Sequence, residues 1–246
     1  MIKLNFFLLL SLFVVNHAFA QNTPADTSKH NTTVIKEDFK DDWAALSHYQ
    51  KENALLGAPK KGEQRVVFLG SSIFENWKKM VPGFFAGRPY LDRGISGQIS
   101  PQLLIRFRQD VIDLQPAAVI ILAGSNDIAG NTGHVTNQVI MNNIASMAEL
   151  AQLHHIKVIL CAYLPVNEFP WRKGMDPAPK IIALNKLIKA YALKNKYTLL
   201  DYFSPLVGEA NGQKPAQTLD GVHPNVEGYK IMAAVTEAAI KQALAR

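Results

Sequence analysis

The chain has 246 residues, of which 48% are apolar and 19% are charged, and its formal net charge is +6. This length and apolar content are typical of one large globular domain, and they exclude a chain that is disordered throughout. The basic residues are scattered rather than grouped in a run with aromatic residues, so no nucleic-acid partner is expected.

Residues 1–20 read MIKLNFFLLLSLFVVNHAFA, with one lysine, an apolar core and a final Ala-Phe-Ala before Gln21. This order predicts a secretory signal peptide with a small-x-small cleavage site. An uncleaved anchor is the alternative, but an apolar core of about ten residues is short for a span that needs about 20. No cysteine stands at the cleavage point, and no later segment is apolar enough for stable membrane insertion. We therefore expect an exported protein, periplasmic or extracellular after cleavage.

Residues 21–34 are polar and rich in turn formers, which is typical of a flexible leader. Residues 35–57 have a helical pattern that places Phe39, Trp43 and Leu46 on one side. We expect this helix to pack on the main domain, which we assign to residues 35–246.

From residue 65 onward, β-rich runs alternate with helical patterns. The runs are 65–70, 90–95, 117–124, 157–164 and 197–203. The helical patterns lie at 73–80, 101–113, 134–155, 178–195 and 225–245. The third and fourth runs are apolar throughout, as strands covered on both faces require. The alternation predicts an α/β fold with a five-stranded parallel sheet between two helical layers.

Several loops that follow these runs carry polar side chains suited to catalysis. In open parallel sheets, functional sites lie outside the carboxyl ends of the strands. The loops in question carry Ser71 and Ser72, then Ser96 and Gly97, then Asn126, and finally Asp220 and His223. We therefore expect one site at this edge of the sheet.

A serine needs a neighbouring base to act as a nucleophile. Of the seven histidines, only His223 lies in a loop at the expected edge. Asp220 precedes it by three residues, so in a tight turn the carboxylate can reach one ring nitrogen and leave the other for the serine proton. The alternative is a helix-entry turn in which Asp220 or Asn225 only caps the last helix.

Acyl transfer also needs donors for the developing oxyanion. Three groups qualify: the backbone N–H of Ser72, the backbone N–H of Gly97 and the side-chain amide of Asn126. The alternatives are an ordinary turn glycine and an asparagine that caps the third strand. The residues alone leave open whether Ser71 or Ser72 is the nucleophile.

Cys161 is the single cysteine, and it lies in the apolar run KVILCAYL. It cannot form an intrachain disulfide, and we expect a buried core residue. The histidines and the cysteine do not show metal-site spacing, so we expect no metal.

The segments GSSI, GISGQ, GSND and DGVHPNVEGY occur in this order, and together they resemble the SGNH hydrolases, also called the GDSL lipase/esterase family. The resemblance covers about residues 65–240. It implies a flavodoxin-like, three-layer α/β/α fold and hydrolysis of an acyl ester without a cofactor. The family's functional positions fall on Ser72 as nucleophile, Gly97 and Asn126 in the oxyanion hole, Asp220 as acid and His223 as base.

One residue departs from the family pattern. Ser71 stands where the family's Gly-Asp-Ser motif has aspartate. Ser71 is thus either a local hydrogen-bonding neighbour or a substitute nucleophile, and we predict that Ser72 is the nucleophile.

The loop NEFPWRKGMDP contains the predicted substrate-binding residues Trp171 and Arg172. Aromatic and cationic side chains together suit a sugar or an anionic group, whereas the alternative is a loop anchored by a buried tryptophan. No long apolar lid is evident. With export, this favours small-molecule or carbohydrate esters, with acetyl groups foremost.

Other functions stay open. The resemblance also permits a lysophospholipase or a thioesterase. A non-catalytic, exported carbohydrate-binding protein on the same fold is the alternative from another class, with Ser71 as its one sequence hint. A third alternative is a purely structural envelope protein, but this function would not explain why the polar loop residues are expected at one edge of the sheet.

Overall fold

The computed structural model describes residues 41–246. The predicted signal peptide, the predicted leader and the first residues of the predicted helix at 35–57 lie outside these residues. Within the described part of the chain, no helix combines the length and the apolar character that a membrane span requires.

The sheet consists of five parallel strands in the order β2-β1-β3-β4-β5. The strands are β1 Val66–Gly70, β2 Tyr90–Gly94, β3 Ala118–Ile121, β4 Lys157–Ala162 and β5 Thr198–Asp201. All residues of β1 and β3 are buried, as expected for strands covered on both faces. The predicted five-stranded parallel sheet is therefore confirmed.

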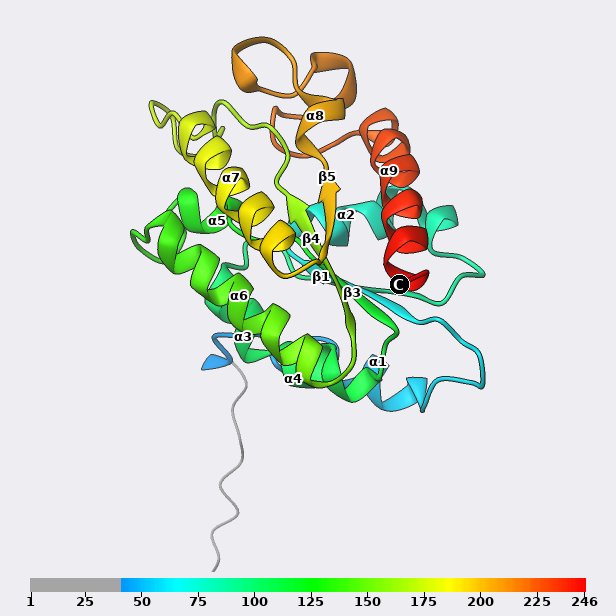
Figure 1. Cartoon of the computed structure of the whole chain (residues 1–246). Coiled ribbons are helices and arrows are strands. Elements are labelled where there is room, and N and C mark those ends of the chain that lie inside the picture. Colours follow the sequence, from blue (N-terminus) through cyan, green and yellow to red (C-terminus); the bar gives the residue numbers. More distant parts are fainter. Residues whose placement is uncertain (1–40) are drawn as a thin grey trace, which may run out of the picture. The chain divides into compact units, whose positions relative to one another are not determined.

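Helices cover both faces of this sheet and complete a three-layer α/β/α arrangement (Figure 1). One face carries α2 Ser72–Met80 and α9 Val226–Leu244. The other carries α6 Asn137–Leu153 and α7 Ala178–Lys194, with α3 Ser100–Ile105 packed against α6. These elements confirm the predicted fold class.

The loops contain more helix than the periodicity predicts. The predicted helix at 101–113 is broken into α3, α4 Phe107–Asp110 and the 3₁₀ helix η3 Ile112–Leu114. The first break falls at Arg106, whose backbone has φ −85° and ψ 2°, while its guanidinium turns inward to bond backbone carbonyls. The unpredicted short elements are η2 Pro82–Phe84, α5 Ser125–Ile128, α8 Phe203–Leu206, η4 Glu209–Asn211 and η5 Pro215–Gln217.

The described part of the predicted helix at 35–57 is helical only in α1 Gln50–Leu56. Residues 41–49 form turns, and Ala45 has φ 54°. Their carbonyls bond glutamine side chains instead of helical N–H groups: those of Trp43, Ala44 and Leu46 accept from Gln102, Gln98 and Gln109. Trp43, expected to pack inward, is 52% exposed. The predicted helix is therefore wrong over 41–49, and we call residues 41–56 the N-terminal strap.

Candidate active site

Ser72 is the first residue of α2, directly beyond the carboxyl end of β1. Trp77, on the buried face of α2, fixes the position of this helix and of Ser72. Its ring stacks on the rings of Phe84 and Tyr229, with centroid distances of 4.4 and 5.4 Å. The Tyr229 hydroxyl also donates to the Ile73 carbonyl at 2.8 Å. Packing against α9 thus fixes the first turn of α2.

Ser71 lies in different surroundings. Its side chain makes no capping hydrogen bond to α2, and the residue is 5% exposed. Burial raises the pKa of Tyr163 to about 12, while the hydroxyls of Ser125 and Ser71 act in the opposite direction as its hydrogen-bond partners. The structure therefore places Ser71 as a buried neighbour of a phenol, and neither serine caps the helix through its side chain.

The structure brings Ser72, His223 and Asp220 together. The Ser72 Oγ atom lies 3.0 Å from His223 Nε2, and His223 Nδ1 lies 2.8 Å from Asp220 Oδ2. These atoms come from segments 151 residues apart in the chain. The carboxylate orients the ring through one nitrogen and leaves the other against the hydroxyl, which is the arrangement that a serine nucleophile needs.

Asp220 is held in its ionised form by its own turn. Its Oδ1 atom accepts from the backbone N–H groups of Val222 and His223 at 2.9 and 2.8 Å. Burial acts to raise the pKa of Asp220, but these bonds and the His223 ring outweigh it, and the pKa is lowered. The carboxylate is therefore available to stabilise a protonated histidine.

Two residues that sequence reasoning missed hold the Asp220–His223 turn in place. The Thr218 hydroxyl donates to the His223 carbonyl at 2.9 Å, and Gln213 Nε2 donates to the Val222 carbonyl at 2.7 Å. No local sequence pattern marks these roles. Both depend on the turn between Thr218 and Pro224, which pair with each other in an antiparallel β-bridge.

Besides Ser72, the predicted oxyanion residues are Gly97, in the turn after β2, and Asn126, and a hydrogen bond joins their two segments. Gly97 has φ 79°, a conformation that favours glycine, and no atom lies within 4 Å of where a side chain would begin. Asn126 is in α5, and its Nδ2 atom donates to the carbonyl of Gln98 at 2.9 Å. An amide has two N–H groups, so one remains available for a ligand. Asn131, also missed from sequence, donates to Asn126 Oδ1 at 3.1 Å and fixes the amide's orientation.

Glu75 joins the loop of Gly97 to the helix of Ser72. Its Oε2 atom accepts from the Ser96 N–H at 2.7 Å and from the Ser96 hydroxyl, and its Oε1 atom accepts from Lys79 at 2.6 Å. Burial acts to raise the pKa of Glu75, but the Lys79 and Ser96 hydrogen bonds outweigh it, and the pKa is lowered. The sequence signal for this role of Glu75 is its position three residues after Ser72, about one helical turn along α2.

The loop after β4 brings Trp171 next to His223. Their ring centroids are 6.2 Å apart, and Trp171 is 45% exposed. Trp171 packs on the fully buried Phe169, so the loop's anchor is the phenylalanine rather than the tryptophan. Arg172 donates to the Gly130 carbonyl at 2.9 Å, which ties the loop to the segment after Asn126.

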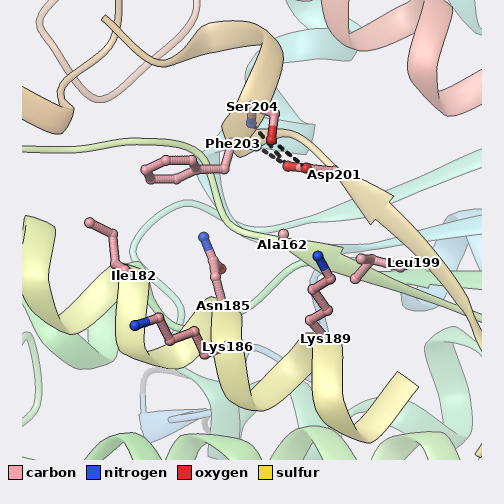
Figure 2. Close-up of a pocket in the computed structure, with 9 residues that line it drawn as sticks. All are labelled: Ala162, Ile182, Asn185, Lys186, Lys189, Leu199, Asp201, Phe203 and Ser204. Atoms are coloured by element: carbon pink, nitrogen blue, oxygen red, sulfur yellow. Dashed lines mark hydrogen bonds between the residues drawn. The ribbon is translucent and has the colours of Figure 1, made fainter. Parts of the chain in front are cut away.

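A separate cavity of about 170 Å³ lies between α7 and the β5–α8 connection (Figure 2). It contains none of the predicted site residues. Its polar groups are largely engaged in the fold, since Asn185 bonds the backbone of Tyr163 and Asp201 accepts from Phe203 and Ser204. Figure 2 shows the Lys189 ammonium turned toward Ala162, whereas the Lys186 side chain runs along α7. We therefore assign the candidate site to the Ser72 edge.

Cys161 is 2% exposed, and burial raises the pKa of its thiol well above the ordinary value. A buried thiol of this kind is a poor nucleophile. Among residues 41–246, no group of three or more His, Cys, Asp or Glu side chains could hold a metal ion.

The parallel sheet between two helical layers carries, at its carboxyl edge, the serine–histidine–aspartate contacts that many hydrolases use. The GDSL-like Lipase/Acylhydrolase family model matches residues 68–231. The chain therefore belongs to this family and is an ester hydrolase.

Two solved structures are similar over most of the chain. A GDSL-like lipase from Bacteroides thetaiotaomicron is 51% identical with a TM-score of 0.79, and the match covers 81% of this chain and 98% of that one. A Bacteroides fragilis protein classed as an acylhydrolase is 46% identical with a TM-score of 0.81, covering 85% and 100%.

More distant proteins share less. An acetyl xylan esterase is 22% identical with a TM-score of 0.58, covering 71% of this chain and 98% of that one, and this likeness concerns the fold. The uncharacterized lipoprotein YqeF of Bacillus subtilis is 35% identical over 81 residues, 32% of this chain and 33% of the relative. The chain thus matches about a third of the length of that curated relative.

Proposed function

We propose that this ester hydrolase is an exported serine esterase that removes small acyl groups, acetyl in particular, from carbohydrate esters. The contact that carries the proposal is the 3.0 Å approach of Ser72 Oγ to His223 Nε2, with Asp220 on the far nitrogen. No metal or cofactor takes part in this reaction.

The reaction proceeds in two halves. His223 Nε2 takes the Ser72 proton while Oγ attacks the ester carbonyl, and the carbonyl π electrons move to the oxygen. The resulting oxyanion accepts from the Ser72 and Gly97 N–H groups and from the Asn126 amide. The tetrahedral intermediate expels the alcohol, which receives the proton from His223. Water then attacks the acyl-enzyme by the same route, and Ser72 and a carboxylic acid are released.

Trp171 supports a carbohydrate as the alcohol part of the ester. Its half-exposed ring lies beside His223, where the leaving group is protonated, and Phe169 supports it from behind. A flat aromatic face at this position suits stacking against a sugar ring. Arg172, although bonded to the Gly130 carbonyl, retains further guanidinium donors for substrate oxygens.

Export rests on the N-terminal segment of residues 1–20 and on the name of the Bacillus subtilis relative, which is a lipoprotein. In this chain the residue after the predicted cleavage site is Gln21 and not the cysteine to which a lipid would be attached. Expression with the native N-terminus should yield a periplasmic or secreted product that begins at Gln21, as read by intact mass. A product that keeps residues 1–20 in the cytoplasm would contradict export.

The first test is hydrolysis of p-nitrophenyl acetate by residues 21–246, beside Ser72→Ala, Ser71→Ala and His223→Ala. We expect Ser72→Ala and His223→Ala to lose similar, large fractions of the activity, because such residues act as a unit. Ser71→Ala should retain most of it. Loss confined to Ser71→Ala would move the nucleophile by one residue.

The substrate class needs a second series. We expect faster release of acetate from acetylated xylo-oligosaccharides than of long-chain acids from lysophospholipid, and Trp171→Ala should raise KM for the sugar ester but not for p-nitrophenyl acetate. A preference for long acyl chains would replace the acetyl esterase with a lysophospholipase. A parent protein that neither turns over esters nor is labelled at Ser72 by a fluorophosphonate would instead be a binding protein.

A further inference from the structure

Gln98 follows Gly97 in the loop of residues 95–99, which we call the Gly97 loop, and all of its polar groups are engaged. Its Oε1 atom accepts from Arg106 Nε at 2.6 Å, and its Nε2 atom donates to the Ala44 carbonyl at 2.8 Å. Its own carbonyl accepts from Asn126 Nδ2 at 2.9 Å. Gln98 is 6% exposed, so these bonds are made away from solvent.

The Oε1 atom of the Gln98 side chain is held by the buried guanidinium of Arg106. The Arg106 guanidinium is fully buried and pairs with Asp110 at 2.9 Å. It also donates to the carbonyls of Gly70 and Arg93 at 3.0 and 2.6 Å, near the ends of β1 and β2. Arg106 therefore joins the Gly97 loop to the strand that leads into Ser72.

The Nε2 atom of the Gln98 side chain donates to the carbonyl of Ala44 in the N-terminal strap. Ala44 is buried, and the nearby Tyr49 hydroxyl donates to the Gly94 carbonyl at 2.5 Å. The strap lies before residue 68, where the family match begins. The Gly97 loop is thus held partly by a segment outside the family-matched residues.

We propose that Gln98 is a positioning residue that couples two of the three oxyanion donors, Gly97 and Asn126, and fixes both against the N-terminal strap. This inference rests on the proposed function, in which these two groups stabilise the oxyanion. The Gln98 backbone holds the Asn126 amide while its side chain holds the Gly97 loop, so displacement of Gln98 moves both donors.

The coupling acts on turnover rather than on substrate binding. The oxyanion exists only in the transition state and the tetrahedral intermediate, so donors aimed at it contribute mainly to kcat. A misplacement of about 1 Å can cost about 100-fold in rate. Loss of the Gln98 anchor should therefore lower kcat and leave KM nearly unchanged.

The experiment measures kcat and KM for p-nitrophenyl acetate in Gln98→Ala, Gln98→Glu, Asn126→Ala and the double variant Gln98→Ala/Asn126→Ala. Gln98→Glu keeps an acceptor for Arg106 but removes the donor to Ala44, so it serves if Gln98→Ala does not fold. Gln109→Ala is the matched control, because Gln109 also donates to a strap carbonyl, that of Leu46, but contacts neither donor. Circular dichroism gives the folded fraction of each variant.

We expect Gln98→Ala and Gln98→Glu to lose about 10- to 100-fold in kcat with KM within about twofold of the parent. Asn126→Ala should lose about 10²- to 10³-fold, and Gln98→Ala should cost less in that background than in the parent. Gln109→Ala should keep kcat within about twofold. This pattern would establish the coupling.

Other patterns overturn it. If Asn126→Ala is impaired but both Gln98 variants keep the parent kcat, the coupling is wrong and the proposed function stands. If the losses of Gln98→Ala and Asn126→Ala simply multiply, the two groups act independently. An equal loss in Gln109→Ala would indicate a general loosening of the strap, and full activity of Asn126→Ala would overturn the oxyanion role itself.

Discussion

Ser71 and Ser72 are neighbours in the chain, yet their surroundings give them different chemistry. Ser72 faces an imidazole nitrogen at 3.0 Å, whereas Ser71 is buried beside the phenol of Tyr163. A hydroxyl without a base in reach remains a weak nucleophile. Under the proposed function we therefore expect Ser71, at the family's aspartate position, to be a buried neighbour and Ser72 to be the nucleophile.

Glu75 permits a sharper prediction at the residue scale. Glu75→Ala removes the acceptor for both the N–H and the hydroxyl of Ser96, so the Gly97 loop loses its bond to α2. We expect a fall of about tenfold or more in kcat with little change in KM, measured on p-nitrophenyl acetate.

Lys79→Ala is the control for Glu75→Ala. It removes an ion pair whose lysine is 63% exposed and leaves the Ser96 bonds in place. Exposed pairs contribute little, so its activity should match the parent. Equal losses in the two variants would contradict a positioning role for Glu75.

At the scale of elements, the first turn of α2 and the end of β2 are packed without room for a side chain. A Cβ atom on Gly94 would lie 2.5 Å from the Glu75 nitrogen and 2.7 Å from the Ser71 carbonyl oxygen. Both contacts are to backbone, which cannot move aside as a flexible side chain can. Glycine at this strand end therefore sets how closely the Gly97 loop approaches Ser72.

Gly94→Ala should lower the free energy of unfolding by about 1–3 kcal/mol or more, because overpacking forces backbone shifts. Urea unfolding measures the change, and the remaining folded enzyme should also show reduced kcat. Gly83→Ala is the matched control, since no atom lies within 4 Å of its Cβ position. If Gly94→Ala unfolds with the same free energy as the parent, α2 and β2 can move apart with little loss of stability, which would contradict this prediction.

At the scale of the whole molecule, a buried carboxyl makes stability depend on pH. Asp92 is 2% exposed, and burial raises its pKa from 3.8 to about 6, against the opposing Gly94 hydrogen bond and nearby cations. The folded chain thus binds this proton more tightly than the unfolded chain does. The contribution of Asp92 to stability falls as pH rises from about 4 to about 6.

Asp92→Asn should therefore stabilise the protein at pH 8 by about 1–3 kcal/mol, while the amide oxygen can still accept from the Gly94 N–H. The difference between parent and variant should shrink as pH falls below about 4, because the parent carboxyl is then neutral in both states. Urea unfolding at several pH values measures this. A variant less stable than the parent at pH 8 would indicate that the charge at Asp92 is compensated.

The sequence was sufficient for features that depend on local patterns. Alternating apolar runs and helical periodicity predicted the five strands and the major helices, and the turn residues at the strand ends marked Ser72, Gly97, Asn126 and His223 as one group. The same periodicity misled over residues 41–49, because glutamine side chains from the Gly97 loop, α3 and α4 take the carbonyls that a helix would have used.

By itself, the sequence determined the layered α/β fold and the candidate residues, because these follow from residue types and short spacings, and the resemblance of its four motifs indicated the family. Only the tertiary structure decided what holds those residues in place. Glu75 meets Ser96 across 21 residues, Arg106 meets Gly70 across 36, and Gln98 meets Ala44 across 54. Such contacts form only when the sheet brings the strand ends together, so no local pattern can encode them.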